Sequence, residues 1–215
     1  GKDGSMYVGG YVNCTPPFGG YPTTVGAFQT TWGGGTGANN GNGNGIGFSC
    51  DMGITKFSPN GTTLIYSTYL GGSDNETPHS LIEDNAGNLA IYGVTYSGDY
   101  PTSSNAFQKN LNSNSDIVVT KLNASGTALI GSTYLGGSGK DGLNNDPGEF
   151  TYGGLKFNYG DQNRGEVNTD NIGNIYVASC TESGNFPVTS GAFQSAKSNG
   201  QDGCVFKLNG NCSQL

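Results

Sequence analysis

Hydrophobic residues lie on both faces of several short segments, which are separated by polar, glycine-rich stretches. In the segment Leu-Ile-Tyr-Ser-Thr-Tyr-Leu, one set of alternate positions begins with Leu64 and Tyr66, and the other includes Ile65 and Tyr69. Residues 117–122 are likewise apolar on both faces. A strand with two apolar faces belongs to a sheet that is covered on both sides. The pattern therefore predicts short strands in stacked sheets.

The first of these segments belongs to an internal repeat. Residues 64–73 read L-I-Y-S-T-Y-L-G-G-S, and residues 129–138, 65 positions later, read L-I-G-S-T-Y-L-G-G-S. Three further features each occur three times in the same order. They are Gly-led apolar runs (4–8, 87–91, 173–177), small-Ala-Phe-Gln boxes after an aromatic-Pro step (26–29, 105–108, 191–194), and Asp-Lys segments (Asp51 and Lys56, Asp116 and Lys121, Asp202 and Lys207). The chain is one repeat array.

Each repeat unit offers four strand candidates: the Gly-led run, the Asp-Lys segment, the Ser-Thr-Tyr-Leu segment and the stretch before the next unit. We expect an all-β fold of β-propeller blades, each with four antiparallel strands. The units span 1–84, 85–170 and an incomplete 171–215. Long insertions lie within 33–47 and 139–170, where added loop length costs little closure entropy.

Composition narrows the function classes. Glycine supplies 39 of 215 residues, charged residues are only 12%, and the formal net charge is -7 with Arg164 as the single arginine. A chain without a basic face is not expected to bind nucleic acid. No segment reaches the roughly 20 apolar residues that a membrane-spanning helix needs.

Several of these motifs carry a family resemblance. The Gly-Asn-Ile-Tyr-Val run at 173–177, the Phe-Pro step at 186–187, the Gly-Ala-Phe-Gln box at 191–194 and the Ser-Thr-Tyr-Leu-Gly-Gly segments at 67–72 and 132–137 resemble the SBBP repeat, a bacterial β-propeller repeat. The resemblance covers the chain apart from its insertions. It implies an exported, modular protein of the bacterial cell surface, often from the Bacteroidetes lineage, and it implies no catalytic residue.

The array contains about three blades, whereas closed propellers have about four to eight. An open stack leaves apolar blade faces and strand edges uncovered. We therefore expect this chain to be part of a larger propeller, with the remaining blades supplied by the same chain or by another.

The chain has five cysteines, which fit an oxidising, exported context. Cys180 and Cys204 lie near facing ends of two strand candidates, and Cys14 and Cys50 flank the long loop of the first unit. We predict a structural disulfide in each of these two pairs, although connectivity does not follow from sequence. A zinc site is the alternative, but the chain has no C-x-x-C spacing and only one histidine, His79.

The recurring Asp and Lys lie five residues apart, so their side chains point to opposite faces of a strand and do not pair within it. They could form a functional ring of charges around a propeller axis. We favour a structural interpretation, in which each Asp fixes the preceding turn through its backbone and each Lys bonds to a neighbouring strand or blade.

The large insertion contains the only dense acidic group. Asp141, Asp146 and Glu149 offer oxygen ligands suitable for calcium, without the spacing of an EF-hand loop. A solvated acidic loop is the simpler interpretation. A glycosidase would need two carboxylates flanking one bond, and a Ser-His-Asp site would depend on His79, which occupies an ordinary strand position.

Aromatic residues in the insertions are candidate binding residues. Trp32 precedes the Gly-rich insertion, while Tyr152, Tyr159 and Arg164 lie in the large one. Such rings stack on sugars or anchor protein partners, or they pack their own loops onto the blade rim.

These observations predict a non-enzymatic, exported scaffold or adhesion module that contacts surface proteins or glycans through its loops. One alternative is a glycan-binding or glycan-cleaving propeller that uses the acidic and aromatic insertion, with calcium as a possible cofactor. Another is a structural subunit of a surface assembly.

Overall fold

The computed structural model describes residues 1–13, 20–34, 50–143 and 165–215. Within these ranges the chain forms ten β-strands and no helix, which confirms the all-β prediction. The strands are β1 (Met6–Asn13), β2 (Cys50–Phe57), β3 (Leu64–Leu70), β4 (Glu76–Glu83), β5 (Leu89–Thr95), β6 (Asp116–Leu122), β7 (Leu129–Leu135), β8 (Glu166–Thr169), β9 (Ile175–Thr181) and β10 (Asp202–Leu208).

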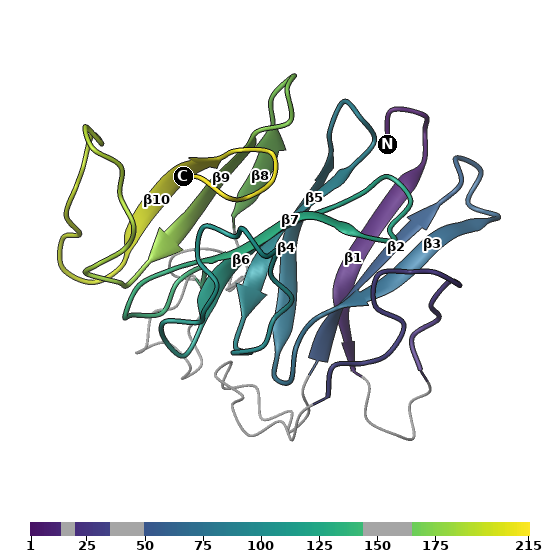
Figure 1. Ribbon diagram of the computed structural model, residues 1–215, viewed down its shortest axis with the longest axis horizontal. Helices are drawn as coiled ribbons and strands as arrows, with labels where there is room; N and C mark the ends of the chain where they lie inside the picture. The colour runs from purple at the N-terminus through teal and green to yellow at the C-terminus, as the bar shows by residue number, and fades with distance from the viewer. Residues whose placement is uncertain (14–19, 35–49, 144–164) are drawn as a thin grey trace, which may run out of the picture.

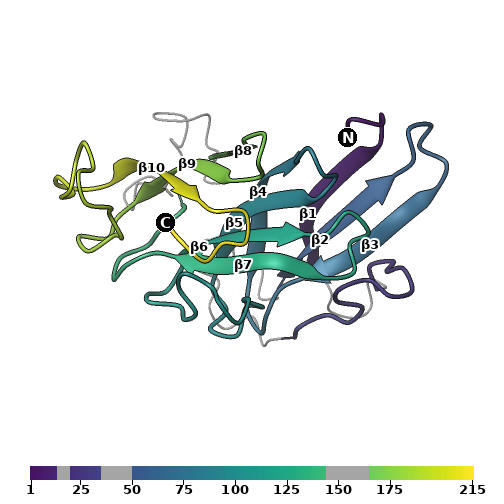
Figure 2. The same cartoon turned by 45° about the horizontal axis from the view of Figure 1, so that its top comes forward.

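The strands form three antiparallel sheets, which Figures 1 and 2 show side by side. The first sheet has the order β1-β2-β3, the middle sheet β4-β5-β6-β7, and the third sheet β10-β9-β8. Each consecutive pair of strands is joined antiparallel, so every sheet is a simple meander. In the described part of the chain none of the sheets closes on itself.

All four predicted strand types are present. The Gly-led runs form β1, β5 and β9, the Asp-Lys segments form β2, β6 and β10, the Ser-Thr-Tyr-Leu segments form β3 and β7, and the stretches before the next unit form β4 and β8. The strand that ends one sequence unit pairs with the first strand of the following unit, as β4 pairs with β5. Each sheet is therefore offset by one strand from the sequence repeat.

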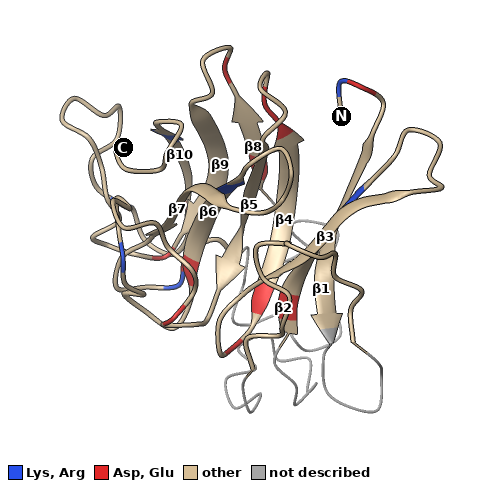
Figure 3. Cartoon of the chain, turned by 45° about the vertical axis from the view of Figure 1, so that its right-hand side comes forward, with Lys and Arg blue, Asp and Glu red and all other residues tan. Residues whose placement is uncertain are grey.

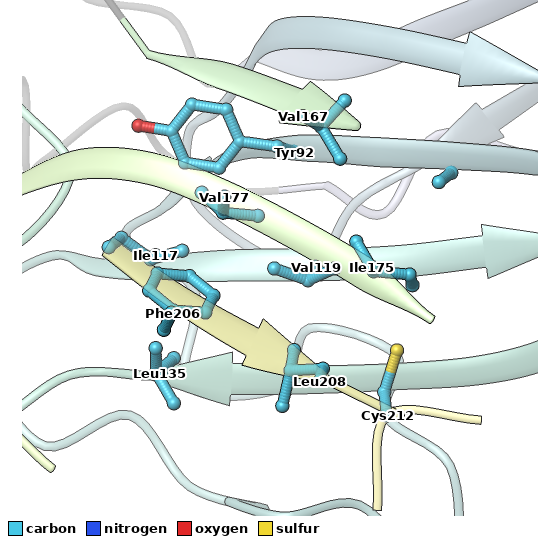
Figure 4. Packing of buried hydrophobic residues seen from close by; sticks show 11 residues of the cluster. Tyr92, Ile117, Val119, Leu135, Val167, Ile175, Val177, Phe206, Leu208 and Cys212 are labelled. Carbon is cyan, nitrogen blue, oxygen red and sulfur yellow. The ribbon is translucent and has the colours of Figure 1, made fainter. Parts of the chain in front are cut away.

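The middle sheet is covered on both faces, as its sequence predicts. Every residue of β5 and β6 is buried. One face packs on the third sheet, where Ile117, Val119 and Leu135 meet Val177 and Leu208 among other apolar residues (Figure 4). The other face packs on the first sheet in a second apolar cluster. These two clusters, one at each sheet junction, are the main cores of the described structure.

The second core contains the residues that join the first and middle sheets. They include Met52, Ile54, Tyr66 and Leu70 from the first sheet, and Leu89, Ile91, Val118, Leu122 and Tyr134 from the middle sheet. Burial of such side chains contributes about 1.5–3 kcal/mol each, so sheet stacking is the main source of stability.

The small-Ala-Phe-Gln boxes cover strand edges. The Tyr69 amide on β3 donates to the Gln29 carbonyl oxygen at 3.0 Å, and the neighbouring Phe28 amide donates to the Gly126 carbonyl oxygen of the middle sheet at 2.9 Å. The second box repeats this arrangement, because the Tyr134 amide donates to the Gln108 carbonyl oxygen and the Phe107 amide to that of Cys212. Each box thus satisfies the exposed edge of one sheet and bonds to the next.

The outer faces of the first and third sheets carry exposed apolar side chains in the described structure. Met6 and Val8 on β1 are 47% and 53% exposed, and Val205 on β10 is 81% exposed. Among the described residues, no helix is long and apolar enough to cross a membrane.

Candidate functional site

Most residues of the predicted loop site lie outside the described part of the chain. Trp32 is half-buried, and its indole nitrogen is buried without a hydrogen-bond partner among the described residues. Tyr152, Tyr159, Arg164, Asp146 and Glu149 lie outside the described residues. The glycan-binding and calcium-binding interpretations of this insertion therefore stay predictions.

Asp141 is the one predicted calcium ligand that the structure describes, and it is fully buried. Its carboxylate accepts hydrogen bonds from the Gly137 amide at 2.8 Å, the Ser183 hydroxyl at 2.6 Å and the Thr181 hydroxyl. Three donors in a buried site satisfy most of the accepting capacity of a carboxylate. In this structure Asp141 is part of a hydrogen-bonded junction between the middle and third sheets.

The same junction brings a second acid close to Asp141. A Cβ atom placed on Gly136 would lie 2.5 Å from Asp116 Oδ1 and 2.8 Å from Asp141 Oδ2. The two carboxylates, one from the middle sheet and one from the entry to the third sheet, therefore face each other across this glycine. Only a glycine leaves room for both of them.

The first junction contains an equivalent acid pair. Glu76 lies 65 positions before Asp141, and a Cβ atom on Gly71 would lie 2.4 Å from Glu76 Oε2 and 2.8 Å from Asp51 Oδ1. Glu76 opens β4 of the middle sheet, whereas Asp51 lies at the start of β2 in the first sheet. Figure 3 shows acidic residues at adjacent ends of these two strands. We call Asp51 and Glu76 the first acid pair, and Asp116 and Asp141 the second.

Three of the four carboxylate oxygens of the first acid pair accept hydrogen bonds. Glu76 accepts hydrogen bonds from the Thr95 hydroxyl at 2.5 Å and the Gly72 amide at 3.0 Å. Asp51 Oδ2 accepts from the Gly33 amide at 3.0 Å and from the Gln29 side chain at 3.2 Å. Asp51 Oδ1 is buried and has no hydrogen-bond partner among the described residues.

Burial changes the acidity of Glu76, Asp51 and Asp116. Desolvation raises the pKa of Glu76 to about 8, and the nearby Asp51 charge adds to this effect. Desolvation also raises the pKa of Asp51 and of Asp116 to about 6, although their hydrogen-bond donors act in the opposite direction. Perturbed acids of this kind occur at functional sites and also in structural networks.

The predicted turn-fixing role of the repeated Asp is confirmed. Asp51 accepts a hydrogen bond from the Gly33 amide, Asp116 from the Asn112 amide at 2.8 Å, and Asp202 from the Ser198 amide at 2.8 Å. In each case the glutamine of the preceding box donates to the same carboxylate.

The predicted role of the repeated Lys is confirmed as well. Lys56 on the first sheet pairs with Glu83 of the middle sheet at 3.4 Å. Lys121 pairs with Asp84, which lies between β4 and β5, at 2.6 Å and donates to the Gly173 carbonyl oxygen of the third sheet at 2.9 Å. Burial acts to raise the pKa of Asp84, but hydrogen bonds from Lys121 and from Asn88 hold it below its usual value.

The predicted disulfide between Cys180 and Cys204 is not present, and both residues carry free thiols. The strand register explains this result, because Cys204 pairs with Ser179 and Cys180 pairs with Gly203. Residues offset by one position across antiparallel strands point to opposite faces of the sheet. Burial raises the pKa of both thiols to about 12. The predicted Cys14–Cys50 bridge involves Cys14, which lies outside the described residues.

Comparison with known proteins does not identify a family. No protein-family model matches the chain. No curated protein matches it either. The resemblance to the SBBP repeat therefore stays a prediction.

The described residues contain no group of three or more His, Cys, Asp or Glu side chains placed to hold a metal ion. The sole histidine, His79, lies edge-on to the Tyr92 ring with the ring centres 5.1 Å apart.

Glu76 is the site residue that sequence reasoning missed. Its position was recoverable from the repeat, because Gly71-Gly72-Ser73 precedes Glu76 with the same spacing as Gly136-Gly137-Ser138 precedes Asp141. The sequence places Asp141 at the edge of an acidic insertion, which drew attention to its neighbours in the loop. The structure instead assigns Asp141 and Glu76 to equivalent positions in the repeat.

Proposed function

We propose that this chain is a non-enzymatic array of β-propeller blades that serves as a scaffold or adhesion module on a bacterial surface. The observation that carries the proposal is the pair of open apolar faces at the two ends of the sheet stack. The resemblance to an exported repeat family supports the location, and the stacking of similar sheets supports the propeller architecture.

The repeat alignment supports a binding role for the outer faces. Met6 and Val8 on the outer face of the first sheet correspond to Leu89 and Ile91, which are 0% and 1% exposed in the middle sheet. In the middle sheet this face is covered by the first sheet. The outer face of the first sheet therefore has the chemistry of a surface that receives another sheet.

The third sheet has the complementary outer face. Tyr176 and Val205 correspond to Ala90 and Val119, which pack on the third sheet. A further blade of the same repeat, whether from a second copy or from another part of the same protein, would cover this surface as the third sheet covers the middle one. Each apolar side chain buried in this way contributes about 1.5–3 kcal/mol to association.

The proposal is tested by the concentration dependence of the molecular mass. We expect the purified chain to associate in analytical ultracentrifugation and to lose this association in Val205→Lys, because a lysine would place a charge on the apolar face. Val25→Lys is the matched control, since Val25 lies in a loop and is fully exposed.

A chain that stays monomeric at all concentrations would contradict the proposed use of these faces. Turnover of a polysaccharide or peptide substrate by the purified chain would contradict its non-enzymatic character.

A further inference from the structure

The first acid pair has a geometry that two ionised carboxylates do not favour. Asp51 and Glu76 are 0% and 1% exposed. Glu76 Oε2 and Asp51 Oδ1 converge on the same glycine, Gly71. Two like charges in a buried site repel each other strongly, because the surrounding medium screens them much less than water does.

Within the described residues, no cation forms an ion pair with the first acid pair. The other titratable groups that interact electrostatically with the pair include Asp99, whose charge acts on Asp51, and the phenols of Tyr100 and Tyr134, whose pKa values burial raises. The described part of the chain thus provides acids and neutral donors at this junction.

One oxygen of the first acid pair lacks a donor. Asp51 Oδ1 is buried and unpartnered among the described residues, whereas the other oxygen of Asp51 and both oxygens of Glu76 accept hydrogen bonds. A proton on Glu76 Oε2 would supply the missing donor and would remove one of the two charges. We propose that Asp51 and Glu76 share one proton, and that this proton couples the first sheet to the middle sheet in a pH-dependent manner.

The two acids belong to different sheets, so loss of the proton acts on the junction itself. When both carboxylates are ionised, their repulsion pushes β2 away from the start of β4. The raised pKa of Glu76, about 8, places this event in the neutral to mildly alkaline range. The unfolded chain releases the same proton near the usual value of 4.5.

The sign of the effect follows from these two values. Between about pH 4.5 and pH 8 the folded protein retains a proton that the unfolded chain has lost, so folded stability decreases as the pH rises through this window. Each pH unit within the window shifts the folding equilibrium by up to about tenfold from this group alone. Above the folded pKa the contribution levels off.

The direct test is a carbon-13 NMR titration of the Glu76 carboxyl in the wild-type chain. We expect a midpoint well above the ordinary glutamate value and a coupled change at Asp51. A midpoint near the ordinary value would overturn the proposal. This measurement needs no variant.

Substitutions provide the second test. In Asp51→Asn, the side-chain oxygen can still accept from Gly33 and Gln29, while the amide group donates to Glu76. We therefore expect the change in the folding equilibrium constant between pH 6 and pH 8 to be at least tenfold smaller than in the wild type. The control is Asp99→Asn, which removes an exposed charge beside the pair and reproduces the Asn185 of the second junction. Equal pH profiles for wild type and Asp51→Asn would overturn the proposal.

Calcium distinguishes a proton from a metal ion at this position. We expect unfolding of the wild type at pH 8 to be unchanged by calcium or by a chelator. If calcium stabilises the wild type and not Asp51→Asn, the pair is a metal site and the shared proton is wrong.

Discussion

The two sheet junctions share one design and differ in their charges. Each has an acid pair across a glycine, a box that covers a strand edge, and a lysine that reaches the next sheet. In the second junction Asp116 Oδ1 accepts a hydrogen bond from the Ser113 hydroxyl at 3.0 Å, whereas Asp51 Oδ1 in the first junction has no such donor.

The lysine of the second junction also has more hydrogen-bond and ion-pair partners in the neighbouring segments than the lysine of the first. Lys121 in the second junction is nearly buried and bonds both Asp84 and the third sheet, while Lys56 in the first junction forms a longer pair with Glu83. The position that matches Asp84 is Gly1 in the first unit. The comparison teaches that the repeat conserves the geometry of the junction more strictly than its electrostatic compensation.

The largest expected effect is on the buried ion pair of the second junction. Lys121→Met leaves Asp84 buried without its cation, and the free energy of unfolding should decrease by about 3–5 kcal/mol in urea denaturation. Lys207→Met is the matched control, because Lys207 is half-exposed and lies 3.6 Å from Asp170. Its loss should cost no more than about 1 kcal/mol. Similar losses in both variants would show that burial of the pair is unimportant.

The next largest loss of stability is expected for a substitution of Tyr134 on β7. The Tyr134 hydroxyl accepts from the Tyr100 amide at 2.9 Å and donates to the Ser97 carbonyl oxygen at 2.8 Å. Tyr134→Phe leaves both backbone groups without this partner, and we expect a loss of about 1–3 kcal/mol in thermal or urea unfolding. Tyr69→Phe makes the equivalent change in the first sheet, where the Tyr69 hydroxyl accepts from the Tyr21 amide. A stabilised Tyr134→Phe would contradict this assignment.

A smaller change should make the second junction resemble the first. Ser113→Ala removes the hydroxyl donor of Asp116 Oδ1, which should raise the pKa of Asp116 above its present value of about 6. We expect a loss of about 1 kcal/mol at pH 8 and a smaller loss at pH 5, because the donor stabilises the ionised form. Urea unfolding at pH 8 and at pH 5 measures these losses in the free energy of unfolding. An equal loss at both pH values would contradict the role of the hydroxyl.

The smallest effect concerns the exposed position beside each acid pair. Asn185 in the second junction corresponds to Asp99 in the first. Asn185 accepts hydrogen bonds from the amide and hydroxyl of Ser138, and Asp99 accepts the same bonds from Ser73. Asn185→Asp should change the stability by no more than about 0.5 kcal/mol, because the added charge is solvated. A larger loss in calorimetry would mean that the charge at this position controls the acid pair.

Much of this architecture was predictable from local patterns. The two-faced apolar strands, the turn-fixing Asp and the outward-reaching Lys all follow from residue type and spacing within a repeat. They are set by interactions that each unit makes in the same way.

The sequence was less informative where pairing between distant segments decides the outcome. The face on which Cys180 and Cys204 lie depends on a strand register that alternation alone does not set. The acid pair depends on the offset between sheet and sequence unit, because Asp51 and Glu76 belong to one sequence unit but to different sheets. The loop residues of the large insertion have no counterpart in other units, so the repeat gives no information about them.

The boxes that cover β3 and β7 have a consequence for self-assembly. Since the boxes already occupy backbone groups along these edges, a neighbouring chain cannot readily extend the sheet by adding a strand there. The association that we propose would instead follow the stacking axis, where one apolar face meets another. The two ways in which β-rich chains associate are thereby separated. Stacking of sheet faces remains possible, whereas the edge-to-edge strand pairing that leads to fibrils is blocked at β3 and β7.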